Sequence, residues 1–192
     1  MSFEQDKLDT IVEYIDRILS LSSPLFLLEI KAIALGQELN LNETLLKKEK
    51  IQKIIISCDA SIKKNPGGPS SVGIVISRPG EKSLELAQGT PATSNNQAEY
   101  DAIYYGITSL IDLHNVPQFP IEVRSDSQLA IKQLNGEMKC NDESLQKRKE
   151  IILELVKNLP TEVKFVWRPR NSTPELKLAN YLCQDYLGIP RH

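Results

Sequence analysis

The spacing of the apolar residues changes at about residue 53, and this change constrains the fold more than any other feature. Before it, apolar residues such as Ile11 and Ile15 recur every three or four positions, which predicts amphipathic helices. After it come short β-prone runs, the first of which begins at Ile54. We therefore expect a helical N-terminal extension over residues 1–50 and a second domain over residues 51–192.

The second domain alternates strand and helix signals in an order that defines a mixed sheet. Strands are predicted over 54–59, 72–77, 84–89, 121–126 and 163–167, and helices over 96–114, 127–134, 142–158 and 175–187. The first three strands follow one another through short turns and should pair antiparallel, whereas helices separate the later strands, which should be parallel. The expected fold class is α/β, with a five-stranded mixed sheet flanked by helices.

Composition excludes several classes of protein. Cys58, Cys140 and Cys183 are far apart and form no Cys-x-x-Cys pair, so neither a structural zinc site nor a disulfide framework is expected, and a reducing cytoplasm fits best. No apolar run approaches the roughly 20 residues that span a bilayer, so no membrane insertion is expected. The net charge of -2 lacks the basic balance of a non-specific nucleic-acid binder. Any nucleic acid must be held by a local patch.

Three acidic residues stand where the predicted elements meet. Asp59 and Asp126 each end a predicted strand, and Glu99 lies in the first turn of the helix that follows the third strand. Ligands of open α/β sheets bind at that edge, so one pocket could gather all three acids. Clustered carboxylates without His or Cys suit a hard cation such as Mg²⁺, which also relieves their repulsion. A single such acid is more often a cap or a solvated turn, so the hypothesis depends on the set.

Each acid lies within a motif of its own. The motifs are Asp59-Ala60-Ser61, the segment Thr93-Ser94-Asn95-Asn96-Gln97-Ala98-Glu99, and Ser125-Asp126-Ser127-Gln128. In this order they resemble the type 1 ribonuclease H family, archaeal-like branch, over residues 54–187. The resemblance implies a ribonuclease H-like fold and an endonuclease that cuts the RNA strand of RNA/DNA hybrids with two Mg²⁺ ions, or Mn²⁺ as the alternative. It also implies 5′-phosphate and 3′-hydroxyl products.

The resemblance assigns roles to further positions. Asp59, Glu99 and Asp126 match the metal-binding catalytic acids. The positions that match hybrid-contacting residues are Ser61, Asn65, Ser94, Asn95, Asn96 and Gln128. Short polar side chains suit the 2′-hydroxyl of RNA, which both donates and accepts a hydrogen bond. Ser94 or Asn95 could equally cap the long helix, and the two roles are compatible.

Two departures from the family pattern concern the last helix and the loop before it. Asn180 stands where the family has a fourth metal-binding aspartate, and its amide oxygen is expected to complete the set. In another register the fourth position falls near Leu176, and Glu175 becomes the candidate. The loop after the fifth predicted strand lacks the histidine that some members of the family carry there. It carries Arg170, which matches an arginine of the archaeal-like branch and could contact a phosphate, or be a solvated surface residue.

These departures leave an alternative function open. The domain could be a catalytically weakened module that binds nucleic acid, or an accessory subunit tethered by its helical arm. The apolar stripes of residues 1–50 need burial, which predicts packing on the catalytic domain, self-association or docking to a protein partner.

Overall fold

The computed structural model describes residues 53–114 and 119–190. The chain divides into two units between Ile51 and Gln52, and the described residues belong to the second unit. The helices expected over residues 1–50 lie outside the described residues. Among the helices of the described ranges, none combines the length and the apolar character that a membrane crossing requires.

The second unit contains a mixed sheet of five strands in the order β3-β2-β1-β4-β5. The strands are β1 (Ile54–Ile62), β2 (Ser70–Ser77), β3 (Leu84–Thr90), β4 (Ile121–Ser125) and β5 (Val163–Trp167). The first three pair antiparallel, while β4 pairs parallel to β1 and β5 parallel to β4. The α/β architecture expected from the sequence is confirmed, including the change from antiparallel to parallel pairing.

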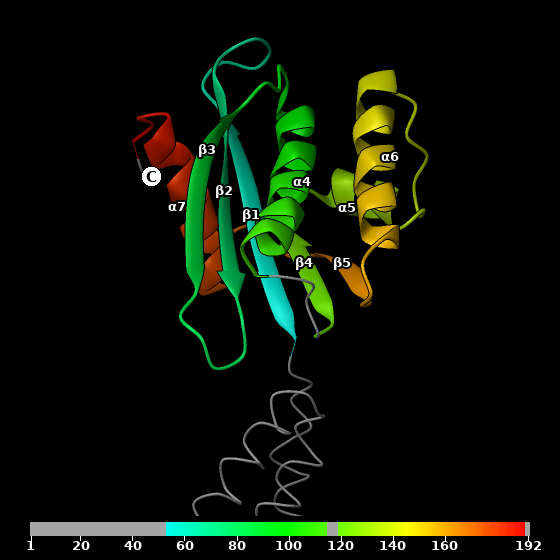
Figure 1. Ribbon diagram of the computed structural model, residues 1–192. Coiled ribbons are helices and arrows are strands. Elements are labelled where there is room, and N and C mark those ends of the chain that lie inside the picture. The colour runs from blue at the N-terminus through cyan, green and yellow to red at the C-terminus, as the bar shows by residue number, and fades with distance from the viewer. Residues whose placement is uncertain (1–52, 115–118, 191–192) are drawn as a thin grey trace, which may run out of the picture. The chain divides into compact units, whose positions relative to one another are not determined.

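Helices cover both faces of this sheet. They are α4 (Asn95–His114), α5 (Gln128–Leu134), α6 (Glu143–Lys157) and α7 (Pro174–Tyr186). Figure 1 shows α7 behind the antiparallel strands and α4 in front of the sheet, with α6 beside α4. A short polar residue caps the N-terminus of each of the last three helices. The side chains of Ser127, Asp142 and Thr173 accept hydrogen bonds from first-turn N–H groups of α5, α6 and α7, respectively.

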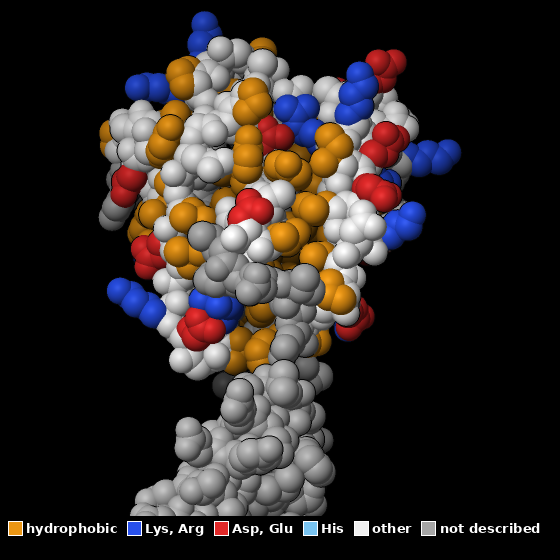
Figure 2. Space-filling view, in the orientation of Figure 1, with side chains coloured by type: hydrophobic (Ala, Val, Ile, Leu, Met, Phe, Trp, Pro, Cys, Tyr) orange, Lys and Arg blue, Asp and Glu red, His pale blue; other side chains and the backbone are white. Residues whose placement is uncertain are grey.

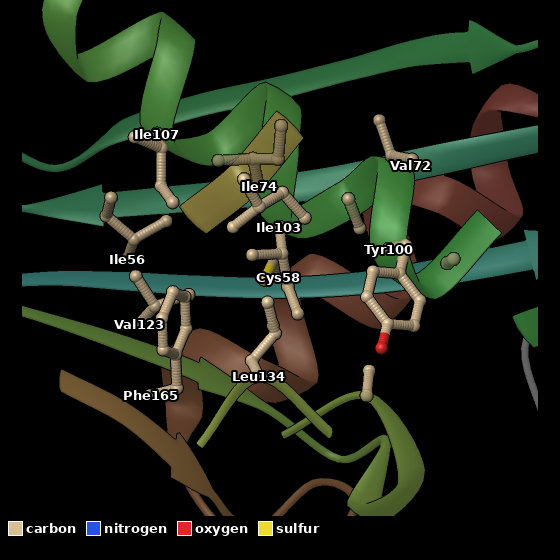
Figure 3. Close-up of a cluster of buried hydrophobic side chains, with 14 of the residues drawn as sticks. Ile56, Cys58, Val72, Ile74, Tyr100, Ile103, Ile107, Val123, Leu134 and Phe165 are labelled. Carbon is tan, nitrogen blue, oxygen red and sulfur yellow. The ribbon is translucent and has the colours of Figure 1, made fainter. Parts of the chain in front are cut away.

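The main core lies between the sheet and α4. Alternate residues of β1 and β2, including Ile56 and Ile74, point toward Ile103 and Ile107 of α4 (Figure 3). The helix approaches closely at Gly106, where a Cβ atom would lie 2.7 Å from Cγ2 of Ile56. Each large apolar side chain buried here contributes about 1.5–3 kcal/mol relative to exposure, so this layer fixes α4 on the sheet.

On the opposite face, α7 packs directly on β2. A Cβ atom at Gly73 would lie 1.9 Å from the carbonyl oxygen of Ala179, so only glycine allows this contact. The Ser71 hydroxyl donates a hydrogen bond to the carbonyl oxygen of Cys183 at 2.6 Å. These contacts hold the middle of α7 next to β1, because Gly73 pairs with Asp59.

Candidate active site

Asp59 lies inside a strand and not at its end, contrary to the sequence prediction. β1 runs on to Ile62 because its antiparallel pairing with β2 continues that far. Its parallel pairing with β4 stops earlier, at Ser57 opposite Arg124. Extending this register by two residues brings Asp59 level with Asp126. The two acids therefore still meet at the edge where β4 ends.

Asp126 and Glu99 reach the same edge from other elements. Asp126 directly follows the last residue of β4 and precedes Ser127, the N-cap of α5. Glu99 is the fifth residue of α4, because the helix begins at Asn95, and so lies just past the predicted first turn. The helix presents Glu99 toward the strand ends, where its carboxylate joins those of Asp59 and Asp126.

The three carboxylates form one compact group. Each of Asp59, Glu99 and Asp126 offers an oxygen, and these oxygens lie within 4.8 Å of one another. Asp59 and Glu99 are 2% and 4% exposed, so neither charge is hydrated to any extent. The convergence predicted from three distant sequence positions is therefore present in the structure.

Burial and mutual repulsion disfavour the charged forms of two of these acids. Burial, followed by the charge of Asp126, raises the pKa of Asp59 to about 7. Burial and the charges of Asp59 and Asp126 raise the pKa of Glu99 well above its ordinary value. The Oε2 atom of Glu99 is buried and accepts no hydrogen bond from any described residue. A buried oxygen without a donor is costly, and a cation would satisfy it.

Arg170 supplies positive charge to the group. Its Nε atom donates a hydrogen bond to Oδ2 of Asp126 at 2.8 Å, and its Nη2 atom lies 3.8 Å from Oδ1 of Asp59. The side chain is half-exposed, so the guanidinium enters from the solvent side. One guanidinium does not balance three carboxylates. The oxygen-only ligands, the excess negative charge and the unpaired Glu99 oxygen together fit a divalent cation.

The fourth position of the family pattern carries no carboxylate in either register. Asn180 is buried on α7, where its Oδ1 accepts a hydrogen bond from Gln184 and its Nδ2 donates toward Asn171. Leu176 is a core residue with 2% exposure. Among the described residues, the group of acids that could share a cation does not include Glu175.

Several candidate substrate residues meet where α4 begins. Asn65 accepts a hydrogen bond from the backbone N–H of Asn95 at 3.3 Å, so the turn after β1 lies against the start of α4. The Ser94 hydroxyl accepts a hydrogen bond from the N–H of Gln97, which confirms its capping role. Asn96 at the start of α4 and Gln128 at the start of α5 are exposed, while Ser61 is half-buried on β1.

Sequence reasoning missed two contacts around the acids. The indole N–H of Trp167 donates to the backbone oxygen of Asp126 at 3.1 Å. Asn171, which has a left-handed backbone with φ of 57°, contacts Asn180. The first contact could have been predicted, because Trp167 is the last residue of β5 and β5 ends at the same edge of the sheet as β4. The second depends on a loop conformation that the sequence pattern does not specify.

A pocket of about 340 Å³ lies away from the acid cluster, on the outer side of α4 toward α6. Its lining includes Tyr104, Tyr105 and Ile151, together with the ion pair between Asp101 and Arg148. Figure 2 shows hydrophobic side chains gathered over the middle of this face, where an acidic side chain also lies, and most of the charged side chains at its margins. None of the three clustered acids lines this pocket.

The architecture and the acid cluster define a ribonuclease H-like domain, and comparisons with known proteins agree. Residues 48–185 match the family described as Reverse transcriptase-like. The chain therefore belongs to this family, and its resemblance to type 1 ribonucleases H is confirmed. Ribonuclease HI of Halobacterium salinarum is 35% identical over 99 residues, which span 51% of this chain and 48% of that protein.

Solved structures of type 1 ribonucleases H share the fold. The RNase H1 of Halobacterium salinarum has a TM-score of 0.63 at 28% identity, covering 71% of this chain and 98% of that one. LC11-RNase H1 in complex with an RNA/DNA hybrid has a TM-score of 0.61 at 28% identity, covering 70% and 99%. The N-terminal RNase H domain of Rv2228c from Mycobacterium tuberculosis has a TM-score of 0.59 at 25% identity, covering 71% and 97%.

Proposed function

We propose that this chain is an endonuclease that hydrolyses the RNA strand of RNA/DNA hybrids, with Mg²⁺ held by Asp59, Glu99 and Asp126. The observation that carries the proposal is the compact group of three carboxylates, of which Asp59 and Glu99 are buried and Glu99 has a buried oxygen without a donor among the described residues. A related structure of the same fold, LC11-RNase H1, is bound to an RNA/DNA hybrid, which supports the substrate class.

The residues around the cation site would have different roles. Asp59, Glu99 and Asp126 would hold the cations through their carboxylate oxygens, which lie within 4.8 Å of one another. When bound, two Mg²⁺ ions, or Mn²⁺ as the alternative, supply an activated water and charge stabilisation at the leaving 3′-oxygen, giving 5′-phosphate and 3′-hydroxyl ends. Asn180 would add an uncharged amide oxygen from α7.

Arg170 and the residues at the start of α4 would bind the hybrid. The guanidinium of Arg170 is anchored on Asp126 and half-exposed, so it can turn toward a phosphate of the RNA strand. Asn65, Ser94 and Asn95 lie together at the N-terminus of α4, where backbone N–H groups favour phosphate and short side chains suit 2′-hydroxyls. Together these groups provide the local patch that the net charge of -2 requires.

A cleavage assay tests this function. A duplex with an end-labelled RNA strand and a DNA complement is incubated with the protein and Mg²⁺, beside duplex DNA of the same sequence. We expect internal cuts in the RNA strand alone, and their loss in Asp126→Asn. Asp112→Asn, an exposed acid of α4, serves as the matched control and should cut normally. No cleavage at high enzyme concentration, or equal cleavage by Asp126→Asn, would contradict the proposal.

A weakened module is the second candidate function, because both registers leave the fourth position without a carboxylate. The weakened-module hypothesis predicts that the domain binds hybrid without turnover and has an accessory role in a larger assembly. Electrophoretic mobility shift and cleavage, measured on the same hybrid, separate the two: a shifted complex without product in Mg²⁺ supports the module, and robust turnover eliminates it.

A further inference from the structure

Asp126 is the first of two residues that connect β4 to α5, and the second is Ser127. The residue before it, Ser125, ends β4 and pairs with Trp167 of β5. The carbonyl oxygen of Ser125 accepts a hydrogen bond from the N–H of Arg168 at 3.0 Å. The residue after it, Ser127, caps α5. The carbonyl group of Asp126 belongs to neither element, so its orientation depends on another contact.

Trp167 makes that contact. Its indole nitrogen donates to the backbone oxygen of Asp126 at 3.1 Å, and an indole has only this one donor. The ring is 40% exposed, although it stands at the end of a strand whose Phe165 is a core residue. Trp167 contacts the backbone of Asp126 and not its carboxylate, whereas Arg170 binds the carboxylate itself. A cation would therefore compete with Arg170 but not with Trp167.

We infer that Trp167 is a positioning residue: by holding the carbonyl group of Asp126, it keeps the Asp126 carboxylate turned toward Asp59 and Glu99 and preorganises the cation site. The inference rests on the cation-binding part of the proposed function and is independent of which nucleic acid is cut. Partners that orient metal ligands in this way typically change cation affinity about 10–100-fold when they are removed.

The test compares Trp167→Phe, which keeps an aromatic ring without the donor, with the wild-type protein. The Mg²⁺ concentration at half-maximal thermal stabilisation should rise about tenfold, while the melting temperature without Mg²⁺ changes little. In the cleavage assay the same shift should appear in the Mg²⁺ dependence, with KM for hybrid unchanged. Tyr186→Leu removes an exposed aromatic at the other edge of the sheet, near Gly89, and should leave every value unchanged.

Two further measurements keep the inference testable if Trp167→Phe folds poorly. Trp167→His restores a ring N–H and should recover part of the lost Mg²⁺ affinity. Trp167 is also the only tryptophan of the chain, so all tryptophan fluorescence comes from this ring. Mg²⁺ should change the wild-type emission with the midpoint of the thermal shift, and Asp126→Asn should abolish the change.

Three results would overturn the inference: an unchanged Mg²⁺ midpoint in Trp167→Phe, a change confined to KM for hybrid, or wild-type fluorescence that ignores saturating Mg²⁺. Failure of the proposed substrate looks different. In that case the wild-type protein binds Mg²⁺ with these midpoints and cuts no hybrid, and the inference about Trp167 still stands.

Discussion

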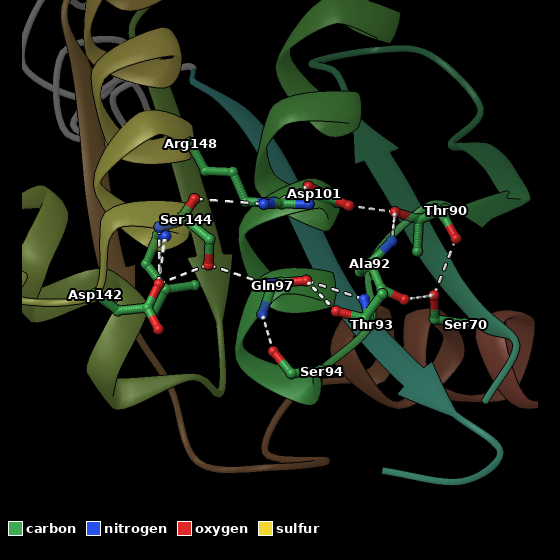
Figure 4. A network of polar contacts seen from close by, with 11 residues as sticks. Ser70, Thr90, Ala92, Thr93, Ser94, Gln97, Asp101, Asp142, Ser144 and Arg148 are labelled. Carbon is green, nitrogen blue, oxygen red and sulfur yellow. Dashed lines mark hydrogen bonds and ion pairs between the residues drawn. The ribbon is translucent and has the colours of Figure 1, made fainter. Parts of the chain in front are cut away.

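Two carboxylates on the same helix, two residues apart, have opposite surroundings. Asp101 faces α6, where it accepts hydrogen bonds from the Thr90 hydroxyl and from Arg148, the latter at 2.7 Å (Figure 4). Glu99 faces the strand ends, where burial and the charges of Asp59 and Asp126 raise its pKa, and its Oε2 has no donor among the described residues. Both acids are buried, at 8% and 4% exposure.

This comparison distinguishes Asp101, a carboxylate that stabilises the fold, from Glu99, a carboxylate suited to bind a cation. Asp101 links α4 to α6 and to the end of β3, so its charge is satisfied within the protein. Glu99 is held in a place that raises its pKa, which lowers stability unless a cation is bound. Burial does not distinguish the two roles, because both acids are buried. The neighbouring charges distinguish them: Asp101 pairs with a cation, whereas Glu99 lies beside two other acids.

The largest effect should come from neutralising each acid in turn. Glu99→Gln should reduce hybrid cleavage by at least about a hundredfold, because a cation ligand loses its charge. Asp101→Asn should cleave hybrid within about twofold of wild type, because it lies outside the cluster. Initial rates at saturating Mg²⁺ check both. Equal losses in the two variants would erase the proposed distinction.

Removing the partner of Asp101 should affect stability and not activity. Arg148→Met leaves Asp101 partly buried without its cation, and after allowance for solvent screening the free energy of unfolding should fall by about 2 kcal/mol. Urea denaturation measures the loss, with Lys147→Met, an exposed neighbour on α6, as the control. If the two variants are equally stable, the ion pair is not what satisfies Asp101.

Cation affinity should depend on pH through Asp59. With its pKa raised to about 7, Asp59 is largely protonated below that pH, and a cation must displace the proton. The Mg²⁺ concentration for half-maximal thermal stabilisation should therefore fall as pH rises toward 7, by about tenfold per unit, and level off above it. A midpoint that is constant between pH 5.5 and 8 would show that Asp59 is charged throughout.

Asp59→Asn should stabilise the protein without Mg²⁺, by about 1 kcal/mol at pH 8, although it abolishes cleavage. The folded pKa of Asp59 lies above its model-compound value of 3.8, so the wild-type protein loses stability as pH rises from about 4 through about 7. The variant lacks this loss, so its advantage should vanish near pH 4. Thermal melts in EDTA at both pH values measure it, and destabilisation at pH 8 would contradict it.

The fold could be predicted from sequence because apolar periodicity records which faces are buried. The order of the nine elements within residues 53–114 and 119–190 follows from it, and β5 and α6 lie within one residue of their predicted bounds. The prediction for Asp59 was wrong because the acid was taken as the end of its strand. β2 is a longer partner than β4 and extends β1 past it, and this follows from pairing and not from local composition.

The site was only partly accessible to sequence reasoning. The convergence of the three acids follows from topology, since parallel neighbours bring their ends to one edge. The contact of Trp167 with Asp126 depends on the register of β4 with β5, and the place of Arg170 depends on how the loop after β5 folds back. All of the proposed hybrid contacts stay predictions, namely those of Ser61, Asn65, Ser94, Asn95, Asn96, Gln128 and Arg170.

Calorimetric titration of Mg²⁺ into the metal-free protein at pH 7.5 tests the cation site most directly. We predict saturable binding to the wild-type protein, with release of protons that increases as the pH is lowered toward 6.5, and affinity at least about tenfold weaker in Glu99→Gln. Asp101→Asn should bind as the wild type does. Absence of saturable binding, or equal binding by Glu99→Gln, would contradict the assignment of Asp59, Glu99 and Asp126 as cation ligands.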